Sequence, residues 1–141
     1  MKTAETQSIT VETLVNAPVE NAWKVFSEPE HIRQWAFASN DWHAPYADND
    51  LRKDGKFKTT MAAKDGSFSF DFEGVYTSVI PNKSFEYVIA DGRTVRVEFI
   101  QEGNGTRIRE TFDPENQNPI DMQRAGWQAI LENYRKHVES I

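Results

Sequence analysis

The spacing of apolar residues divides the chain into strand-like and helix-like segments. Residues 8–15 alternate between apolar and polar side chains, and this period of two predicts a half-buried strand. Residues 19–27 instead place apolar side chains three or four positions apart, which predicts a short amphipathic helix. Pro29 ends that helix and introduces a second one, predicted over residues 30–35.

The rest of the chain separates into a strand-rich part and one long helix. Residues 38–50 are mostly polar and are expected to be irregular, with a possible short strand over residues 41–44. Residues 51–113 consist of alternating runs broken by turn signals, which predicts an antiparallel meander. Pro119 suits a first helical turn, and the helical spacing from there to residue 140 predicts a helix roughly 30 Å long. The predicted fold class is α+β.

One face of the predicted meander is apolar and the other is charged, as expected for a sheet with one face covered. The apolar face is expected to carry Phe57, Thr59, Met61, Phe68, Phe70, Phe72, Gly74, Tyr76, Phe85, Tyr87, Ile89, Val95, Val97, Phe99, Ile108, Glu110 and Phe112. The opposite face is expected to carry Lys56, Lys58, Ser69, Asp71, Glu73, Arg96, Glu98, Arg107 and Arg109.

Composition narrows the function classes. A chain of 141 residues is expected to form a single domain over residues 1–141. The absence of cysteine excludes thiolate catalysis and cysteine-bound zinc or iron–sulfur clusters, and it fits a reducing compartment. The formal net charge of -6 argues against nucleic-acid binding. The polar N-terminus lacks a signal peptide, and no segment is apolar enough for integral membrane association, so we expect a cytoplasmic protein.

Several short motifs along the chain resemble those of the SRPBCC superfamily, in particular the branch named after the activator of heat-shock protein 90 ATPase. The resemblance covers about Ile9 to Val138. It is carried by Trp35 after a proline-led helix, Asn49-Asp50-Leu51-Arg52, Phe72-Glu73-Gly74-Val75-Tyr76, Glu110-Thr111-Phe112, and Gln123-Arg124-Ala125-Gly126-Trp127 ahead of Leu131.

The resemblance implies a START-like or birch-allergen-like helix-grip fold. In this fold a curved antiparallel sheet of about seven strands wraps around the C-terminal helix and encloses a hydrophobic cavity. The superfamily includes lipid and hormone carriers, polyketide cyclases and the co-chaperone domain, so the fold leaves the function open. The co-chaperone itself resembles a longer chain with an additional N-terminal domain, which makes a chaperone the less expected partner.

Glu110 is the main candidate for chemistry, because the alternation places its carboxyl on the apolar face. A buried carboxyl has a raised pKa and could serve as a general acid or base, or hold the polar end of a ligand. Alternatively, a bulge would turn it outward, or an arginine such as Arg124 would pair with it. His43 could move a proton at neutral pH, although a lone histidine in a loop is more often solvated.

No metal or cofactor site is predicted. The three histidines are far apart in the sequence, and none forms a ligand pair with metal-binding spacing. The aromatic residues could either line a pocket or fill a core. Gly126 favours a pocket slightly, because a glycine within a helix is unfavourable and suggests that a strand or a ligand needs the space beside it.

The first functional hypothesis is a binding protein for a small hydrophobic or aromatic molecule, such as a lipid or a polyketide-like or flavonoid-like compound. The second is an enzyme of the polyketide cyclase or dehydratase type that uses Glu110. The third is a co-chaperone-like protein-interaction domain, and we expect a monomer or weak dimer. The predicted ligand-binding residues are Trp35, Trp42, Phe57, Met61, Phe70, Phe72, Tyr76, Tyr87, Val97, Phe99, Glu110, Gln123, Gly126, Trp127 and Ile130.

Overall fold

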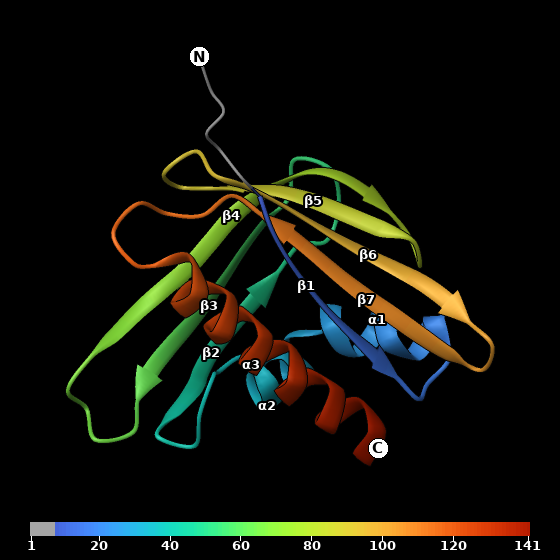
Figure 1. Cartoon of the computed structure of the whole chain (residues 1–141), viewed down its shortest axis with the longest axis horizontal. Helices are drawn as coiled ribbons and strands as arrows, with labels where there is room; N and C mark the ends of the chain where they lie inside the picture. The colour runs from blue at the N-terminus through green and yellow to red at the C-terminus, as the bar shows by residue number, and fades with distance from the viewer. Residues whose placement is uncertain (1–7) are drawn as a thin grey trace.

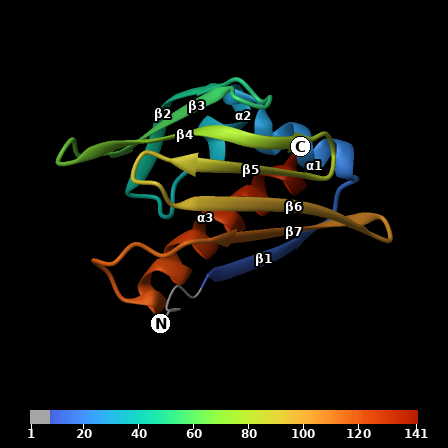
Figure 2. The ribbon, with the colours of Figure 1, turned by 90° about the horizontal axis from the view of Figure 1, so that it is seen from above.

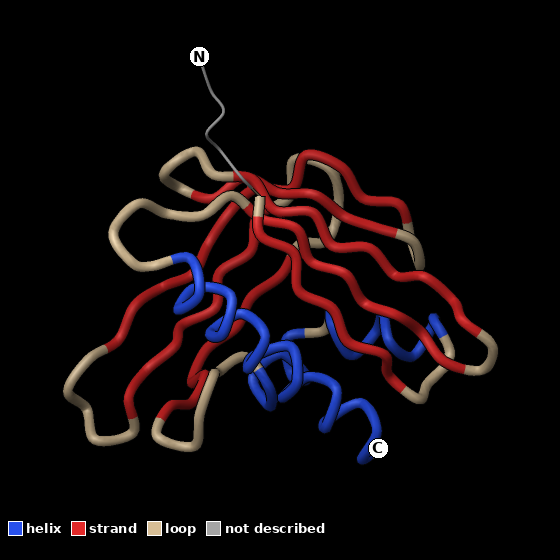
Figure 3. The backbone as a smooth tube through the Cα atoms, viewed as in Figure 1, coloured by secondary structure: helices blue, strands red, loops and turns tan. Residues whose placement is uncertain are grey.

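The computed structural model describes residues 8–141, so the N-terminal stretch on which the expected lack of a signal peptide rests lies outside the described residues. The elements follow the predicted order and are shown in Figures 1 and 3. Their bounds are β1 (Ile9–Val15), α1 (Val19–Ser27), α2 (Pro29–Trp35), β2 (Trp42–Asn49), β3 (Lys56–Ala63), β4 (Ser69–Ile80), β5 (Ser84–Ile89), β6 (Thr94–Glu102), β7 (Gly105–Phe112) and α3 (Ile120–Ser140).

All seven strands form one antiparallel sheet in the order β1-β7-β6-β5-β4-β3-β2. From β2 to β7 each strand pairs with its neighbour in the chain, while β1 returns to pair with β7 at the far edge. The sheet curls partly around α3, which crosses its inner side (Figures 1 and 2). This arrangement confirms the predicted helix-grip fold.

The predicted irregular segment is instead largely a strand. β2 extends over Trp42–Asn49, well past the short strand expected at residues 41–44. It lies at the edge of the sheet and pairs only with β3, with a register shift between His43 and Tyr46. Pro45 falls at this irregularity, where its missing N–H breaks no ladder. An edge strand needs only one buried face and one partner, which explains why the polar sequence hid it.

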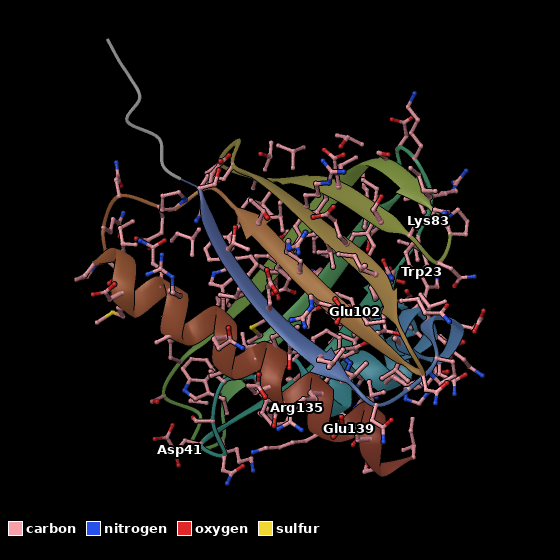
Figure 4. All side chains as sticks on the ribbon, turned by 45° about the vertical axis from the view of Figure 1, so that its right-hand side comes forward. Trp23, Asp41, Lys83, Glu102, Arg135 and Glu139 are labelled. Carbon is pink, nitrogen blue, oxygen red and sulfur yellow. The ribbon has the colours of Figure 1, made fainter. Side chains whose placement is uncertain are left out.

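The core has one centre beneath α1 and α2. The ring of Phe26 packs on Phe99 and Tyr134, with centroid distances of 5.5 and 4.9 Å. Trp23, labelled in Figure 4, packs on Phe99 from the next turn of α1 at 5.0 Å. Tyr134 is fully buried and donates a hydrogen bond of 2.7 Å to the Ala22 carbonyl oxygen. These contacts fix α3 against α1.

The outer face of the sheet carries charge pairs across three strands. Arg107 donates to Glu12 at 3.2 Å and to Glu102, labelled in Figure 4, at 2.7 Å. Arg109 donates to Glu12 at 2.9 Å and lies 3.8 Å from Glu98. The charged, solvent-exposed face of the sheet is therefore the one that alternation predicted.

Within residues 8–141, none of the helices combines the length and apolar character that a membrane crossing demands.

Candidate functional site

A cavity of about 230 Å³ lies between the inner side of the sheet and the helices. Its walls come from both short helices, from strands β2, β3, β4, β5 and β7, and from α3. Apart from Glu110, the described side chains that line it are apolar, aromatic, hydroxyl or amide groups, and none of them is Lys, Arg or His. The cavity is therefore a mostly apolar space with one carboxyl.

The structure brings most of the sequence-predicted residues together around this cavity. Those that line it are Trp35, Phe57, Met61, Phe70, Phe72, Tyr76, Tyr87, Glu110, Trp127 and Ile130. Trp127 also stacks on Phe112, with ring centroids 3.8 Å apart and planes at 13°. The stacked pair fixes one indole face and leaves the other side of the ring toward the cavity wall formed with Phe72, 6.0 Å away.

Five predicted residues do not line the cavity. Val97 and Phe99 are buried on the inner face of β6, but α1 covers that end of the sheet, so Phe99 packs on Trp23. Gln123 donates to the Glu115 and Asn118 carbonyl oxygens at 3.0 and 2.8 Å, and thus secures the loop before α3.

Gly126 faces open space, since a Cβ added there would meet no atom within 4 Å. Neither a strand nor the cavity needs its small size, contrary to the expectation. Trp42 stands behind a lining residue, with its ring 6.1 Å from Phe70.

Sequence reasoning missed part of the lining. The additional lining residues are Phe26, Ser27, Ile32, Ala36, Asn49, Thr59 and Phe85. Thr59 and Phe85 lie on strand faces predicted to point inward, so alternation could have found them. Asn49 carried no such signal. It accepts a hydrogen bond of 2.6 Å from the Tyr76 hydroxyl and donates one of 2.6 Å to the Ser27 carbonyl oxygen, which ties β2 to α1 and β4.

Glu110 points into the cavity as predicted. β7 pairs with β1 and β6 in unbroken register, with Val11 and Val97 as the neighbours of Glu110, so no bulge turns the side chain outward. Its side chain lines the cavity, and the residue is only 8% exposed. Arg124, the partner considered from the sequence, instead pairs with Asp121 on the surface at 3.3 Å.

Burial alone raises the pKa of Glu110 to about 8. No described residue contributes a hydrogen bond or a charge that opposes this increase. At neutral pH the group is therefore mainly a neutral carboxylic acid, which can both donate and accept a hydrogen bond.

Tyr87, like Thr59, is a buried polar lining residue whose hydroxyl has no hydrogen-bond partner among the described residues. It is 7% exposed, and burial together with the nearby Glu110 charge raises its pKa well above 10. No hydrogen bond from a described residue counters this effect. Tyr76 and Tyr134, by contrast, donate to Asn49 and Ala22. The unpaired O–H donors of Glu110 and Tyr87 therefore line the same cavity.

His43 does not join this group. It is exposed on β2 and borders a separate shallow hollow with Lys64 and Ser67 of the β3–β4 turn. Among the described residues, no group of three or more His, Asp or Glu side chains is arranged to hold a metal ion. The chemistry of the cavity thus depends on one carboxyl and on tyrosine hydroxyls.

An exposed aromatic cluster lies beside the cavity at the end of β4. Phe68 is 60% exposed although alternation predicted it to face inward, while Phe70 lines the cavity as predicted and is still 42% exposed. Their rings and that of Trp42 are each about 6.1 Å from the other two. Because Phe70 both lines the cavity and contacts solvent, the cavity approaches the surface at this cluster.

The chain resembles known proteins along nearly its whole length. The family described as Activator of Hsp90 ATPase homolog 1-like protein matches residues 16–139. An AHSA1-like protein from Aeromonas hydrophila is 40% identical and gives a TM-score of 0.90, covering 95% of this chain and 93% of its own. Chr148 from Cytophaga hutchinsonii is 53% identical with a TM-score of 0.82, covering 94% and 92%. NE0264 from Nitrosomonas europaea, at 18% identity, shares the fold with a TM-score of 0.83 over 99% of both chains. Comparison with curated proteins gives no match.

Proposed function

The chain belongs to the Activator of Hsp90 ATPase homolog 1-like family, and from that premise we propose that it binds a small hydrophobic or aromatic molecule in the cavity between sheet and helix. The observation that carries this proposal is a mostly apolar cavity lined by a carboxyl that has no hydrogen-bond or charge partner among the described residues. The proposed location is cytoplasmic, in keeping with a sequence that contains no cysteine.

The size of the cavity supports a bound molecule. The cavity here has about 230 Å³ and mostly apolar walls, so a ligand that fills it would gain affinity by removing apolar surface from water. The volume is below the roughly 300–1,000 Å³ of pockets for drug-sized ligands, so a molecule with one or two rings fits better than a long acyl chain.

The position of the tryptophans allows a direct test by proton–nitrogen NMR titration with small aromatic compounds. The indole signals of Trp35 and Trp127 report on the cavity, while that of Trp23, which lies on α1 and packs on Phe99, is an internal reference. We expect saturable shifts of the first two signals and little change in the third. An unchanged spectrum across compounds of this size would argue against the container function.

The exposed aromatic cluster supports a second candidate function, a protein-interaction surface. Phe68 and Phe70 are exposed and pack with the partly buried Trp42, and exposed apolar patches commonly mark interaction sites. The family name suggests a heat-shock protein ATPase as the partner. The test is that ATPase rate with wild type and with Phe68→Ser: stimulation by wild type alone would support this function, and no effect of either would refute it.

The cyclase-like alternative has less support. Such an enzyme needs a second proton-transfer group beside Glu110, and His43 borders a different hollow from the cavity. Among the described lining residues, Tyr76 and Tyr87 are the other titratable groups that could transfer a proton. Burial holds the pKa of Tyr87 well above 10, so it is a weak acid for such a reaction.

A further inference from the structure

The cavity is lined by hydrogen-bond donors without a partner among the described residues, and two of them are Glu110 and Tyr87. Glu110 and Tyr87 both line it, both are more than nine-tenths buried, and neither has a hydrogen-bond partner among the described residues. A buried polar group without a partner is unfavourable by roughly 1–3 kcal/mol. A bound molecule that supplies the missing acceptor would therefore remove this unfavourable free energy for each group.

The number and charge of these groups discriminate between ligand classes. A neutral carbonyl oxygen has two lone pairs, so it can accept hydrogen bonds from both Glu110 and Tyr87. A carboxylate would lose its hydration without meeting a cation, because no Lys, Arg or His of residues 8–141 lines the cavity. An ammonium has three donors but would find one acid group, so some of its N–H groups would stay unsatisfied in an apolar space.

We propose that the ligand of this cavity is an uncharged aromatic or alicyclic compound with a carbonyl group, whose oxygen accepts hydrogen bonds from the Glu110 carboxylic acid and the Tyr87 hydroxyl. This inference rests on the proposed container function. It assigns Glu110 and Tyr87 the selection of the polar group and leaves the apolar walls to bind the rings.

Four naphthalene derivatives of nearly equal shape test the proposal: acetylnaphthalene, isopropylnaphthalene, naphthoate and naphthylmethylamine. Their affinities for the wild-type protein are measured by calorimetry and by the Trp127 indole signal. We expect acetylnaphthalene to bind at least about five-fold more tightly than the hydrocarbon, the effect of one net hydrogen bond. The hydrocarbon should in turn bind more tightly than the carboxylate or the amine.

Variants at the two donors identify the groups responsible. Tyr87→Phe and Glu110→Leu should each remove most of the preference for the ketone over the hydrocarbon while retaining hydrocarbon binding. Glu110→Gln keeps an N–H donor but cannot titrate. Ketone affinity should therefore fall in the wild type as pH rises through about 8 and stay constant in Glu110→Gln.

Other groups near the carboxyl do not account for that pH dependence. The tyrosines around Glu110 are Tyr76 on β4, Tyr87 on β5 and Tyr134 on α3, and burial raises the pKa of each above 10. All three therefore stay neutral between pH 7 and 9, where Glu110 titrates.

The outcomes separate the two proposals. Hydrocarbon and ketone binding with equal affinity would preserve the container function and overturn the carbonyl assignment. Tightest binding of naphthoate or naphthylmethylamine would overturn it as well. Failure of all four compounds to bind would refute the container function itself for molecules of this size. A ketone preference that survives both Tyr87→Phe and Glu110→Leu would show that other groups recognise the oxygen.

Discussion

The buried carboxyl of Glu110 should make the protein less stable as pH rises. We consider the change Glu110→Gln, which keeps the shape of the side chain but removes its ionisation. In the folded protein the pKa is raised from an ordinary 4.5 to about 8, because burial disfavours the charged form. The unfolded chain therefore releases the proton at a lower pH than the folded protein.

The magnitude follows from this difference in pKa. Below pH 4.5 both states hold the proton and Glu110 adds no pH dependence; between 4.5 and about 8 only the unfolded chain has lost it. In that range the free energy of unfolding falls by about 1.4 kcal/mol per pH unit. Between pH 5 and 9 the accumulated loss is about 4 kcal/mol, after allowing for partial titration at both ends.

Urea unfolding of wild type and Glu110→Gln at pH 5, 7 and 9 measures this loss. The histidines and surface carboxyls are common to both proteins, so their contributions cancel in the difference between the two curves. Glu73→Gln, which removes an exposed carboxyl on β4, is the matched control. We expect the stability of Glu110→Gln relative to wild type to increase with pH. Parallel curves for the two proteins would refute the reasoning, because they would mean that the carboxyl is solvated or paired.

Three further predictions concern the helices. Gly126→Ala should stabilise the protein by about 1 kcal/mol, because a helical glycine is unfavourable and the added methyl meets no atom within 4 Å; a lower urea midpoint would contradict this. Tyr134→Phe should destabilise it by roughly 1–2 kcal/mol, since the Ala22 carbonyl loses its donor; an unchanged midpoint would mean that this oxygen finds another. The Nε2 atom of His137 lies 3.1 Å from Nδ1 of His31, and burial together with that neighbour lowers the pKa of His137. The free energy of unfolding should therefore be constant above about pH 6.5, as far as this group is concerned, and fall as the pH drops below it. His137→Gln should flatten this acid limb of the stability curve, and an unaltered limb would assign it to other groups.

Alternation predicted the central strands well because one face of each is covered and the other is wet. Glu110 is the clearest case: its direction was counted from Ile108 and Phe112, and β7 keeps its register throughout. Counting failed just before β4 begins at Ser69, where Phe68 shares the inward phase but is 60% exposed. β2 was hidden because an edge position tolerates Pro45 and a register shift.

The cavity lining was harder to predict than the fold. The alternation of apolar and polar residues predicts which face of the sheet a side chain is on. It does not predict which helix, or whether the cavity, lies against that face. Phe99 and Tyr87 both point inward, yet one packs under α1 and the other reaches the cavity. Asn49 lines the cavity through hydrogen bonds to Tyr76 and Ser27, contacts between segments far apart in sequence. Such contacts leave no periodic signal in the chain.

The pairing of β1 with β7 has a consequence for how the chain folds. Every other strand pair is a local hairpin, which closes a short loop, whereas Ile9 pairs with Phe112 and so joins segments separated by most of the chain. Closing such a long loop loses chain entropy before the contacts of β1 with β7 can compensate for it. The hairpins of β2 to β7 should therefore form before β1 pairs with β7. Since α3 packs against β1, the container would become closed only in this last step. A ligand could then be captured while the chain is still folding, before α3 and β1 complete the walls.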